Sequence, residues 1–365
     1  MSGRPREIAF ASDSARLLLA ASRERFSVAA ADLLLPERSR LTEWQRHTAA
    51  ALLARLIRSI EDMLRADLAA QFDGYEPLQA TLSSADVAIA LPLLERAQVL
   101  RDADLGTVLV RRVEEHRYWR EYGANSARDL LARLIQDEDE AIASEAMTML
   151  IARSRRFDRY QEPLLGHTDL PADLQHRLVW MVAAALRQYI VQYHDKVPVG
   201  VVDAVIGPTA GRMIACYDEG ATMEASATRL ARQLRRAERL EGADLSVMLE
   251  EGLLPLFVAG LAVRCAIDAM SAWEILSDPQ GKGPAFLLRG ASLSRSDAAA
   301  ILLSLNSRGR LFSGPEGDAA VAQVELFDGI DESAAAAVLR IWQADPGYRA
   351  AIARLSTRRP IPDAA

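Results

Sequence analysis

The chain has 365 residues, of which half are hydrophobic and only 6% aromatic, and its formal net charge is −7. This acidic net charge excludes a global attraction to nucleic acid or anionic lipid, but it does not exclude a local basic stripe on the surface. Ala and Leu dominate the apolar half, which favours helices. The two cysteines lie far apart in the sequence. Such spacing indicates reduced thiols in a cytoplasmic protein better than a disulfide framework.

Membrane insertion and export are not expected from the apolar stretches. The first one, 17–21, is short and flanked by charged residues, unlike an export signal. The most apolar later stretches, 178–186 and 253–261, fall short of the roughly 20 residues that cross a bilayer. We therefore expect a cytoplasmic protein without membrane contact.

The first predicted elements are two long helices. Residues 13–35 suit a helix within an N-terminal helical segment, 1–40, and residues 42–72 suit a second helix. The second one opens with Thr42-Glu43-Trp44-Gln45, which has the pattern of a capping box. Apolar residues then follow at helical spacing.

The stretch 83–109 has the pattern of a helical repeat, in which each half is a cap, a short amphipathic helix and a turn. A later acidic segment repeats the first half, with Asp86 aligned to Asp139 and Ile89 to Ile142. Helix pairs that recur in this way cannot bury their apolar faces alone, so they stack on one another. Both isoleucines are accordingly expected to face neighbouring helices.

Pro and Gly gather at 197–211, where we place a boundary or a change of stacking direction. The expected fold class is all-α, an α-solenoid of stacked helix pairs of the HEAT or armadillo type, in one array or two sub-arrays. The predicted ranges are an N-terminal helical segment (1–40), a helical-repeat array (41–196), a C-terminal helical-repeat region (213–355) and a frayed tail (356–365).

Several of these segments resemble a known bacterial family. The likeness lies in Thr42 to Phe72, Ser84-Ala85-Asp86-Val87-Ala88 through Leu94, Val99 to Leu105, Gly252 to Phe257, Ile275 to Pro279 and Leu287 to Ala291. Over roughly residues 42–305 the chain is similar to the domain-of-unknown-function family numbered 2336. The resemblance implies an all-helical, HEAT-like protein of alphaproteobacterial type, and it provides no established catalytic residues.

No motif in the sequence indicates a metal, a cofactor or a catalytic centre. The five histidines do not pair with one another, or with a cysteine, at metal-ligand spacing. The acidic run 137–140 lacks the Gly of a calcium loop and suits a helix cap. Gly281-Lys282-Gly283-Pro284 lacks the upstream Gly and the following Ser or Thr of a phosphate loop, so a turn explains it better. We expect no cofactor and leave enzymatic activity open, with the balance against it.

The surface offers two candidate interfaces, of which the first lies on an amphipathic helix predicted at 222–241. Its basic members fall within an arc of about 120° at 100° per residue; they are Arg229, Arg232, Arg235, Arg236 and Arg239. Apolar residues take the opposite arc, namely Ala227, Leu230, Leu234 and Ala237. A solvated outer face is the simpler interpretation, and contact with an acidic partner or nucleic acid is the alternative.

The second candidate interface mixes arginines with aromatic residues, as binding hot spots do. Its members are Arg111, Arg112, Arg117, Tyr118, Trp119, Arg120 and Tyr122. The alternative is that Trp119 and Tyr122 pack between helices. The sequence does not decide between these two possibilities.

The leading functional hypothesis is a cytoplasmic helical-repeat scaffold or regulator that binds another protein. A second hypothesis is a HEAT-like nucleic-acid-binding or base-processing protein, which the acidic balance disfavours. A third is a small-molecule sensor with a pocket at the Pro/Gly-rich boundary. The partner, the pathway and the oligomeric state stay open.

Overall fold

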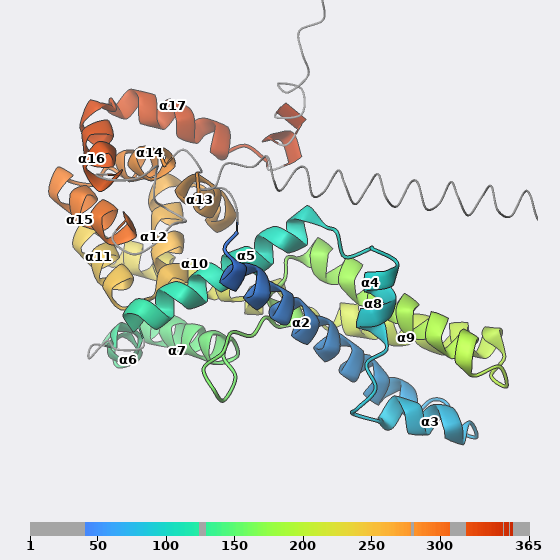
Figure 1. Ribbon diagram of the computed structural model, residues 1–365. Coiled ribbons are helices and arrows are strands. Elements are labelled where there is room, and N and C mark those ends of the chain that lie inside the picture. Colours follow the sequence, from blue (N-terminus) through green and yellow to red (C-terminus); the bar gives the residue numbers. More distant parts are fainter. Residues whose placement is uncertain are drawn as a thin grey trace, which may run out of the picture. The chain divides into compact units, whose positions relative to one another are not determined.

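The computed structural model describes residues 41–123, 129–278, 281–306, 319–345, 347–349 and 351–352 (Figure 1). The predicted N-terminal segment (1–40) and the predicted tail (356–365) lie outside the described residues. Nearly all of the described residues belong to one compact unit, Trp44–Ala365, and the account below concerns that unit.

Every regular element in the described part of the chain is a helix, which confirms the predicted all-α class. The α-helices are α2 (Glu43–Ala69), α3 (Glu76–Ser83), α4 (Ala90–Arg96), α5 (Ala103–Tyr118), α6 (Leu130–Ile135), α7 (Glu140–Ser154), α8 (Ala172–Tyr193), α9 (Val199–Ala215), α10 (Met223–Arg236), α11 (Gly242–Glu250), α12 (Leu254–Cys265), α13 (Ala269–Leu276), α14 (Gly283–Gly290), α15 (Arg295–Asn306), α16 (Ala319–Gly329) and α17 (Glu332–Trp342). Three short helices, η2 (Trp119–Gly123), η3 (His167–Asp169) and η4 (Glu219–Ala221), join them. The pair Phe157 and Pro163 forms an isolated β-bridge.

Neighbouring helices pack in pairs, among them α6 with α7, α8 with α9 and α15 with α16 (Figure 1). The long predicted helix at 42–72 is α2, and the apolar residues at its helical spacing are buried, as expected; these are Leu52, Leu56, Ile57, Ile60, Leu64 and Leu68. The stacking of the pairs into a solenoid remains a prediction.

The predicted repeat register is wrong in its first half. Asp139 caps α7 as expected, because its Oδ1 accepts hydrogen bonds from the amides of Ala141 (2.9 Å) and Ile142 (3.4 Å). Asp86, its predicted counterpart, lies in a non-helical segment, and α4 begins only at Ala90. Ile89 and Ile142 are nevertheless both buried, 3% and 0% exposed. Burial was therefore predicted correctly and helical alignment was not.

A carboxylate from another helix takes over the capping of α4. Glu61 of α2 accepts hydrogen bonds from the amides of Ile89 (Oε1, 3.0 Å) and Ala90 (Oε2, 2.9 Å). The same carboxylate pairs with Arg65 one turn along α2, at 3.0 Å, and both side chains are almost fully buried. Arg65 also donates to the carbonyl of Leu82 at 2.9 Å and to further carbonyls at the end of α3. This buried ion pair thus holds the α3–α4 connection on α2.

The Pro/Gly-rich stretch at 197–211 does not interrupt the helices, because most of it belongs to α9. Pro208 lies inside this helix and gives up one backbone donor. Val202, Ile206 and Ala210 are buried at helical spacing and compensate for that loss. Pro198 stands at the N-cap, where a proline is tolerated.

The buried apolar residues form two cores. The first contains residues of α2–α5, α8 and α9, and the second contains residues of α6, α7 and α10–α17. The segment 129–154, predicted as part of the 41–196 array, therefore packs in the second core; the division into domains itself stays a prediction. Helix α5 contributes to both cores, with Val113 in the first and Tyr118 in the second. Its buried charged residues flank Val113, with Arg111 and Arg112 before it and Glu114 and Glu115 after it.

Candidate functional site: a charged cavity between the two cores

Helix α5 places its arginines in the interior and not on a surface. Arg111 and Arg112 are only 5% and 3% exposed. Arg117 is half-buried and pairs with Glu114 at 2.6 Å, whereas Arg120 is exposed. The predicted basic-aromatic interface is therefore not one continuous surface, because its members have different surroundings.

The aromatic members of that predicted interface make contacts inside the protein. The ring centroid of Trp119 lies 4.4 Å from that of Phe157, and the centroid of Tyr118 lies 4.5 Å from that of Tyr122. Tyr118 is buried, and the Nε1 atom of Trp119 is buried as well. These contacts favour the alternative in which Trp119 and Tyr122 pack between helices.

Two glycines allow this close packing at the end of α5. Gly252 has φ +70°, and a Cβ atom there would lie 2.7 Å from the backbone nitrogen of Gly123. A Cβ atom on Gly123 would in turn lie 2.5 Å from a ring carbon of Trp119. Only glycine avoids both the strained backbone and the collision. The turn before α12 is thereby pressed against η2.

His116, one turn before η2, is buried against Trp119 and Phe157. Its Nε2 atom lies 2.9 Å from the carbonyl oxygen of Gln161. Burial lowers the pKa of His116, and the nearby charge of Arg112 acts in the same direction. The imidazole is therefore neutral at pH 7.

Helix α10 presents the first candidate interface. Its apolar residues Ala227, Leu230 and Leu234 are buried as predicted, so the opposite side faces solvent. Arg232, Arg235 and Arg236 are exposed on that side, and we call them the α10 arginine row.

The two outer members of this interface differ from the expectation. The helix ends at Arg236, so Arg239 lies beyond it. Arg239 pairs with Asp137 at 2.6 Å, and Arg229 pairs with Glu145 at 2.9 Å. The structure thus brings the central three arginines together; of these, Arg235 also lies 3.5 Å from Glu241, whereas Arg232 and Arg236 make no ion pair among the described residues.

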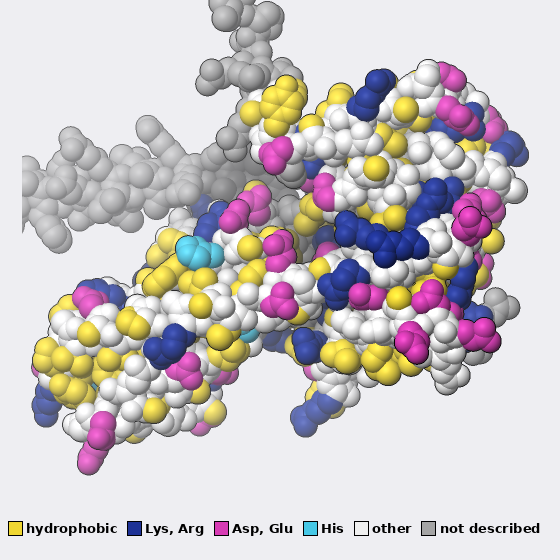
Figure 2. Space-filling view, turned by 180° about the vertical axis from the view of Figure 1, so that it is seen from behind, with side chains coloured by type: hydrophobic (Ala, Val, Ile, Leu, Met, Phe, Trp, Pro, Cys, Tyr) yellow, Lys and Arg dark blue, Asp and Glu magenta, His cyan; other side chains and the backbone are white. Residues whose placement is uncertain are grey.

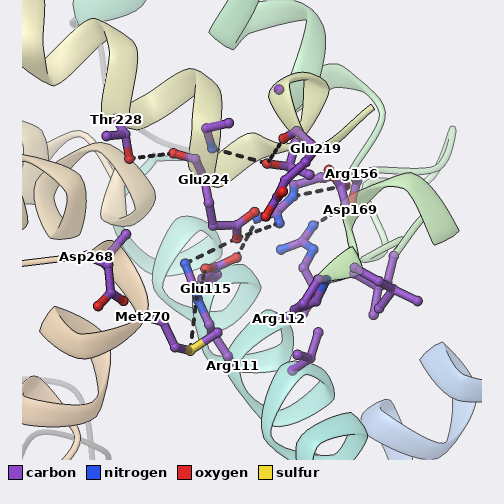
Figure 3. A pocket seen from close by; sticks show the side chains of 18 of the residues that line it. Arg111, Arg112, Glu115, Arg156, Asp169, Glu219, Glu224, Thr228, Asp268 and Met270 are labelled. Atoms are coloured by element: carbon purple, nitrogen blue, oxygen red, sulfur yellow. Dashed lines mark hydrogen bonds and ion pairs between the residues drawn. The ribbon is translucent and has the colours of Figure 1, made fainter. Parts of the chain in front are cut away.

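A buried ion cluster joins α5 to α10 and to the segment between α7 and α8 (Figure 3). Its five members are Arg111, Glu115, Arg156, Asp169 and Glu224. Glu115 accepts from Arg111 at 3.0 Å and from Arg156 at 2.6 Å. Glu224 lies 3.1 Å from each of these two arginines, and Asp169 lies 3.3 Å from Arg156.

The charges within this cluster stabilise one another. Although burial lowers the pKa of Arg156, its three carboxylate neighbours raise it above the ordinary value. Burial raises the pKa of Glu224, but Arg156 and Arg111 outweigh this effect and hold it below its usual range. Arg156 and Glu224 are therefore both charged at neutral pH, and each lies against a group of opposite charge, as a buried ion cluster requires.

Arg112 lies beside the cluster and makes no carboxylate ion pair among the described residues. Its Nε donates to the carbonyl of Leu164 at 3.0 Å, and one Nη donates to the carbonyl of Arg156. The guanidinium carbon stands 5.2 Å from the centre of the Phe157 ring. Burial and the charge of Arg156 lower the pKa of Arg112 to about 10. Its positive charge is thus the least neutralised of the buried arginines described here.

The cluster forms part of the wall of a cavity of about 800 Å³ (Figure 3). Helices α5, α10 and α13 and the segments around η3 and η4 surround this cavity. The charged lining residues outside the cluster are Arg112, Glu219, Arg229, Arg232 and Asp268, and the apolar ones include Val108, Leu165, Leu170 and Met270. Residues 197–211, where a pocket was expected, do not contribute to it. Concave sites of this size are typical of ligand binding.

Most members of the buried ion cluster were not predicted from the sequence. Glu115 follows Arg111 at helical i,i+4 spacing, a signal that could have identified this pair. Arg156, Asp169 and Glu224 come from three other segments, and nothing local links them. Only the tertiary structure brings them together.

The segment 281–284 forms the turn at the start of α14. Asp278 accepts from the amides of Lys282 (2.9 Å) and Gly283 (3.1 Å), so a protein side chain occupies amides that a phosphate would need. Within the described part of the chain, no three His, Cys, Asp or Glu residues are placed to hold a metal ion.

None of the described helices is by itself long and apolar enough to cross a bilayer. Helices α12 and α13 reach the required length and composition only together, bent by 104°, and most of their side chains are buried in the second core.

Comparison with known proteins gives a family and no individual relative. No curated protein and no solved structure matches the chain. A family model described as an uncharacterised protein conserved in bacteria, domain of unknown function 2336, matches residues 124–340. The matched range contains α10, α12 and Gly252, whereas the N-terminal motifs at 42–105 lie outside it. Because this model covers more than half of the chain, the protein belongs to the bacterial domain-of-unknown-function family 2336.

Proposed function

We propose that this chain is a cytoplasmic helical-repeat scaffold or regulator that acts by binding another protein. The observation that carries the proposal is the α10 arginine row, which projects into solvent from a helix whose other side is anchored in the second core. Cys216 and Cys265, both free thiols in the structure, are compatible with a reducing compartment.

The row has the geometry of a binding site for an acidic segment. Arg232 is followed by Arg235 and Arg236 at i+3 and i+4, so the three guanidinium groups share one side of the helix. A guanidinium group can bind a carboxylate in a bidentate manner, and Arg232 and Arg236 make no ion pair among the described residues. On the face shown in Figure 2, Lys and Arg side chains gather with acidic side chains beside them. We therefore expect a partner that presents carboxylates from a helix or an extended segment.

Nucleic-acid binding has less support from the charges. Arg229, Arg235 and Arg239 form ion pairs with carboxylates of the chain itself. The net charge of −7 adds a general repulsion from phosphate backbones. We expect binding to random duplex DNA at near-physiological salt to be no tighter than about 10⁻⁴ M.

Charge reversal of the row tests the proposal. The variant Arg232→Glu/Arg236→Glu is compared with Arg96→Glu/Arg340→Glu, which makes the same charge change at two exposed positions elsewhere. Affinity capture from the native organism, identified by mass spectrometry and repeated with purified partner, should recover an acidic partner with the wild type and the control. The row variant should lose it.

Two results would count against this function. Equal capture of every partner by the row variant would remove α10 as the interface. Micromolar, salt-sensitive binding to duplex DNA that disappears in the row variant would favour the nucleic-acid hypothesis instead.

A further inference from the structure

The cavity between the two cores is a candidate binding site in addition to the α10 arginine row. Its wall combines first-core residues, such as Val108 and Leu170, with residues of α10 and α13, which belong to the second core. Ligand sites are common where two packed bodies meet. A molecule in this cavity contacts both cores at once.

The apolar part of the lining accommodates a hydrocarbon body. Val108, Leu165, Leu170 and Met270 line the cavity together with Ala225 and Ala269. Its volume of about 800 Å³ lies within the usual range for small-molecule sites. The small side chains on α10 and α13 leave this space open.

The carboxylates of the buried ion cluster are already neutralised. Glu115 and Glu224 each contact two arginines, and Asp169 contacts one. Asp268 accepts from the amide of Ser271 and so caps the start of α13. These acidic groups are therefore engaged within the chain, and Glu219 is the lining carboxylate that makes no ion pair among the described residues.

Two guanidinium groups in the lining have no carboxylate partner among the described residues. Arg112 bonds only backbone carbonyls, and Arg232 is exposed at the edge of the cavity without an ion pair. Arg232 lies two helical turns along α10 from Glu224, so it stands at the opposite end of the α10 wall from the cluster. Although Glu115, Asp169 and Glu224 act on Arg112 from nearby, neither arginine is bound to a carboxylate, and such groups at the wall of a partly apolar cavity favour an anion.

We propose that the cavity binds a small amphipathic anion, an organic molecule with an apolar body and one carboxylate or phosphate group. The apolar body lies against the aliphatic lining, and the anionic group bonds Arg232 at the edge, with the charge of Arg112 adding attraction from the wall. This site makes the protein a sensor of such a molecule, in addition to its binding of a partner.

Fluorescence titration with anilinonaphthalene sulfonate tests the site, because this probe is itself an amphipathic anion. We expect saturable binding of one probe per chain. Octanoate and octyl phosphate should displace it, and the stronger competitor of the two identifies the head group. Octylamine, which has the same chain and the opposite charge, should not displace it.

Variants on α10 locate the binding. Arg232→Glu should weaken octanoate or octyl phosphate by about tenfold or more, the effect of losing a charge-assisted hydrogen bond. Arg236→Glu makes the same change outside the cavity lining and should bind normally. Thr228→Trp should fill the cavity and abolish binding, whereas Gln233→Trp, on the same helix but outside the lining, should not. Melting curves of all four variants verify that they are folded.

Three outcomes would overturn the proposal. One is competition by octylamine as strong as that by octanoate, which would point to Glu219 and Asp268 as a cation site. Another is probe binding that Arg232→Glu and Thr228→Trp both leave unchanged. The third is displacement by an acidic peptide but by neither octyl anion, which would make the cavity part of the partner interface. The first two results leave the capture experiment unaffected. Because Arg232 belongs to both sites, capture with Arg235→Glu/Arg236→Glu, two positions outside the cavity lining, separates loss of the partner from loss of the anion.

Discussion

Replacing Trp119 with Ala should destabilise the protein, because the indole packs inside it. The ring lies 4.4 Å from Phe157 and 5.9 Å from His116, measured between centroids, and its edge faces the Cα atom of Gly123. A void of about 30 Å³ already adjoins this side chain.

The magnitude follows from the size of the side chain and its partial burial. A buried Trp→Ala change costs about 3–5 kcal/mol. Trp119 is half-buried, so we expect the lower end, about 3 kcal/mol in the free energy of unfolding. In domains of a few hundred residues, 1 kcal/mol moves Tm by about 2–4 °C, so Tm should fall by about 6 °C or more.

Urea and thermal unfolding, followed by far-UV circular dichroism, provide the measurement. Trp180→Ala is the matched control, since Trp180 is 38% exposed on α8; its Tm should change far less. The amount of captured partner should fall only as far as the folded fraction of the variant falls. A Trp119→Ala protein with normal Tm and missing partners would refute the packing argument and restore Trp119 as an interface residue.

Three further predictions follow from buried groups. Ile89→Asp and Ile142→Asp should each cost several kcal/mol through an unpaired buried charge, and unchanged urea midpoints would contradict the observed packing. Glu61→Ala should cost about 3–5 kcal/mol because it leaves Arg65 buried without its counter-ion and α4 uncapped; a loss below 1 kcal/mol in the same assay would show that water replaces the carboxylate. The folded pKa of His116 is lowered, so the unfolded chain binds its proton first, and stability should fall as pH decreases below about 6.5. His116→Gln should reduce this slope between pH 7 and 5, and an identical slope would assign the pH dependence to other groups.

Local signals in the sequence were enough for the helices and their buried sides. Asp139 caps α7 because a cap needs only a side chain two or three residues before the amides that it bonds. The apolar spacing in α2 and α10 predicted which residues are buried, since a helix repeats its contacts every turn. The same reasoning placed Ile89 in the interior, although the register assigned to it was wrong. This reasoning failed at α9, where Pro and Gly predicted an interruption of the helix. The buried apolar residues of α9 stabilise a continuous helix there instead.

The all-α class, most helix positions and the exposed row on α10 could therefore be predicted from the amino-acid sequence. These depend on interactions between residues a few positions apart. The burial of Arg111 and Arg112 could not be predicted from neighbouring residues, because an arginine is buried only where other groups form hydrogen bonds or ion pairs with it. Those partners, the carboxylate of Glu224 and the carbonyl of Leu164, come from distant segments. Tertiary packing alone decided that an apparent surface patch became the wall of a cavity, since it controls which distant groups meet.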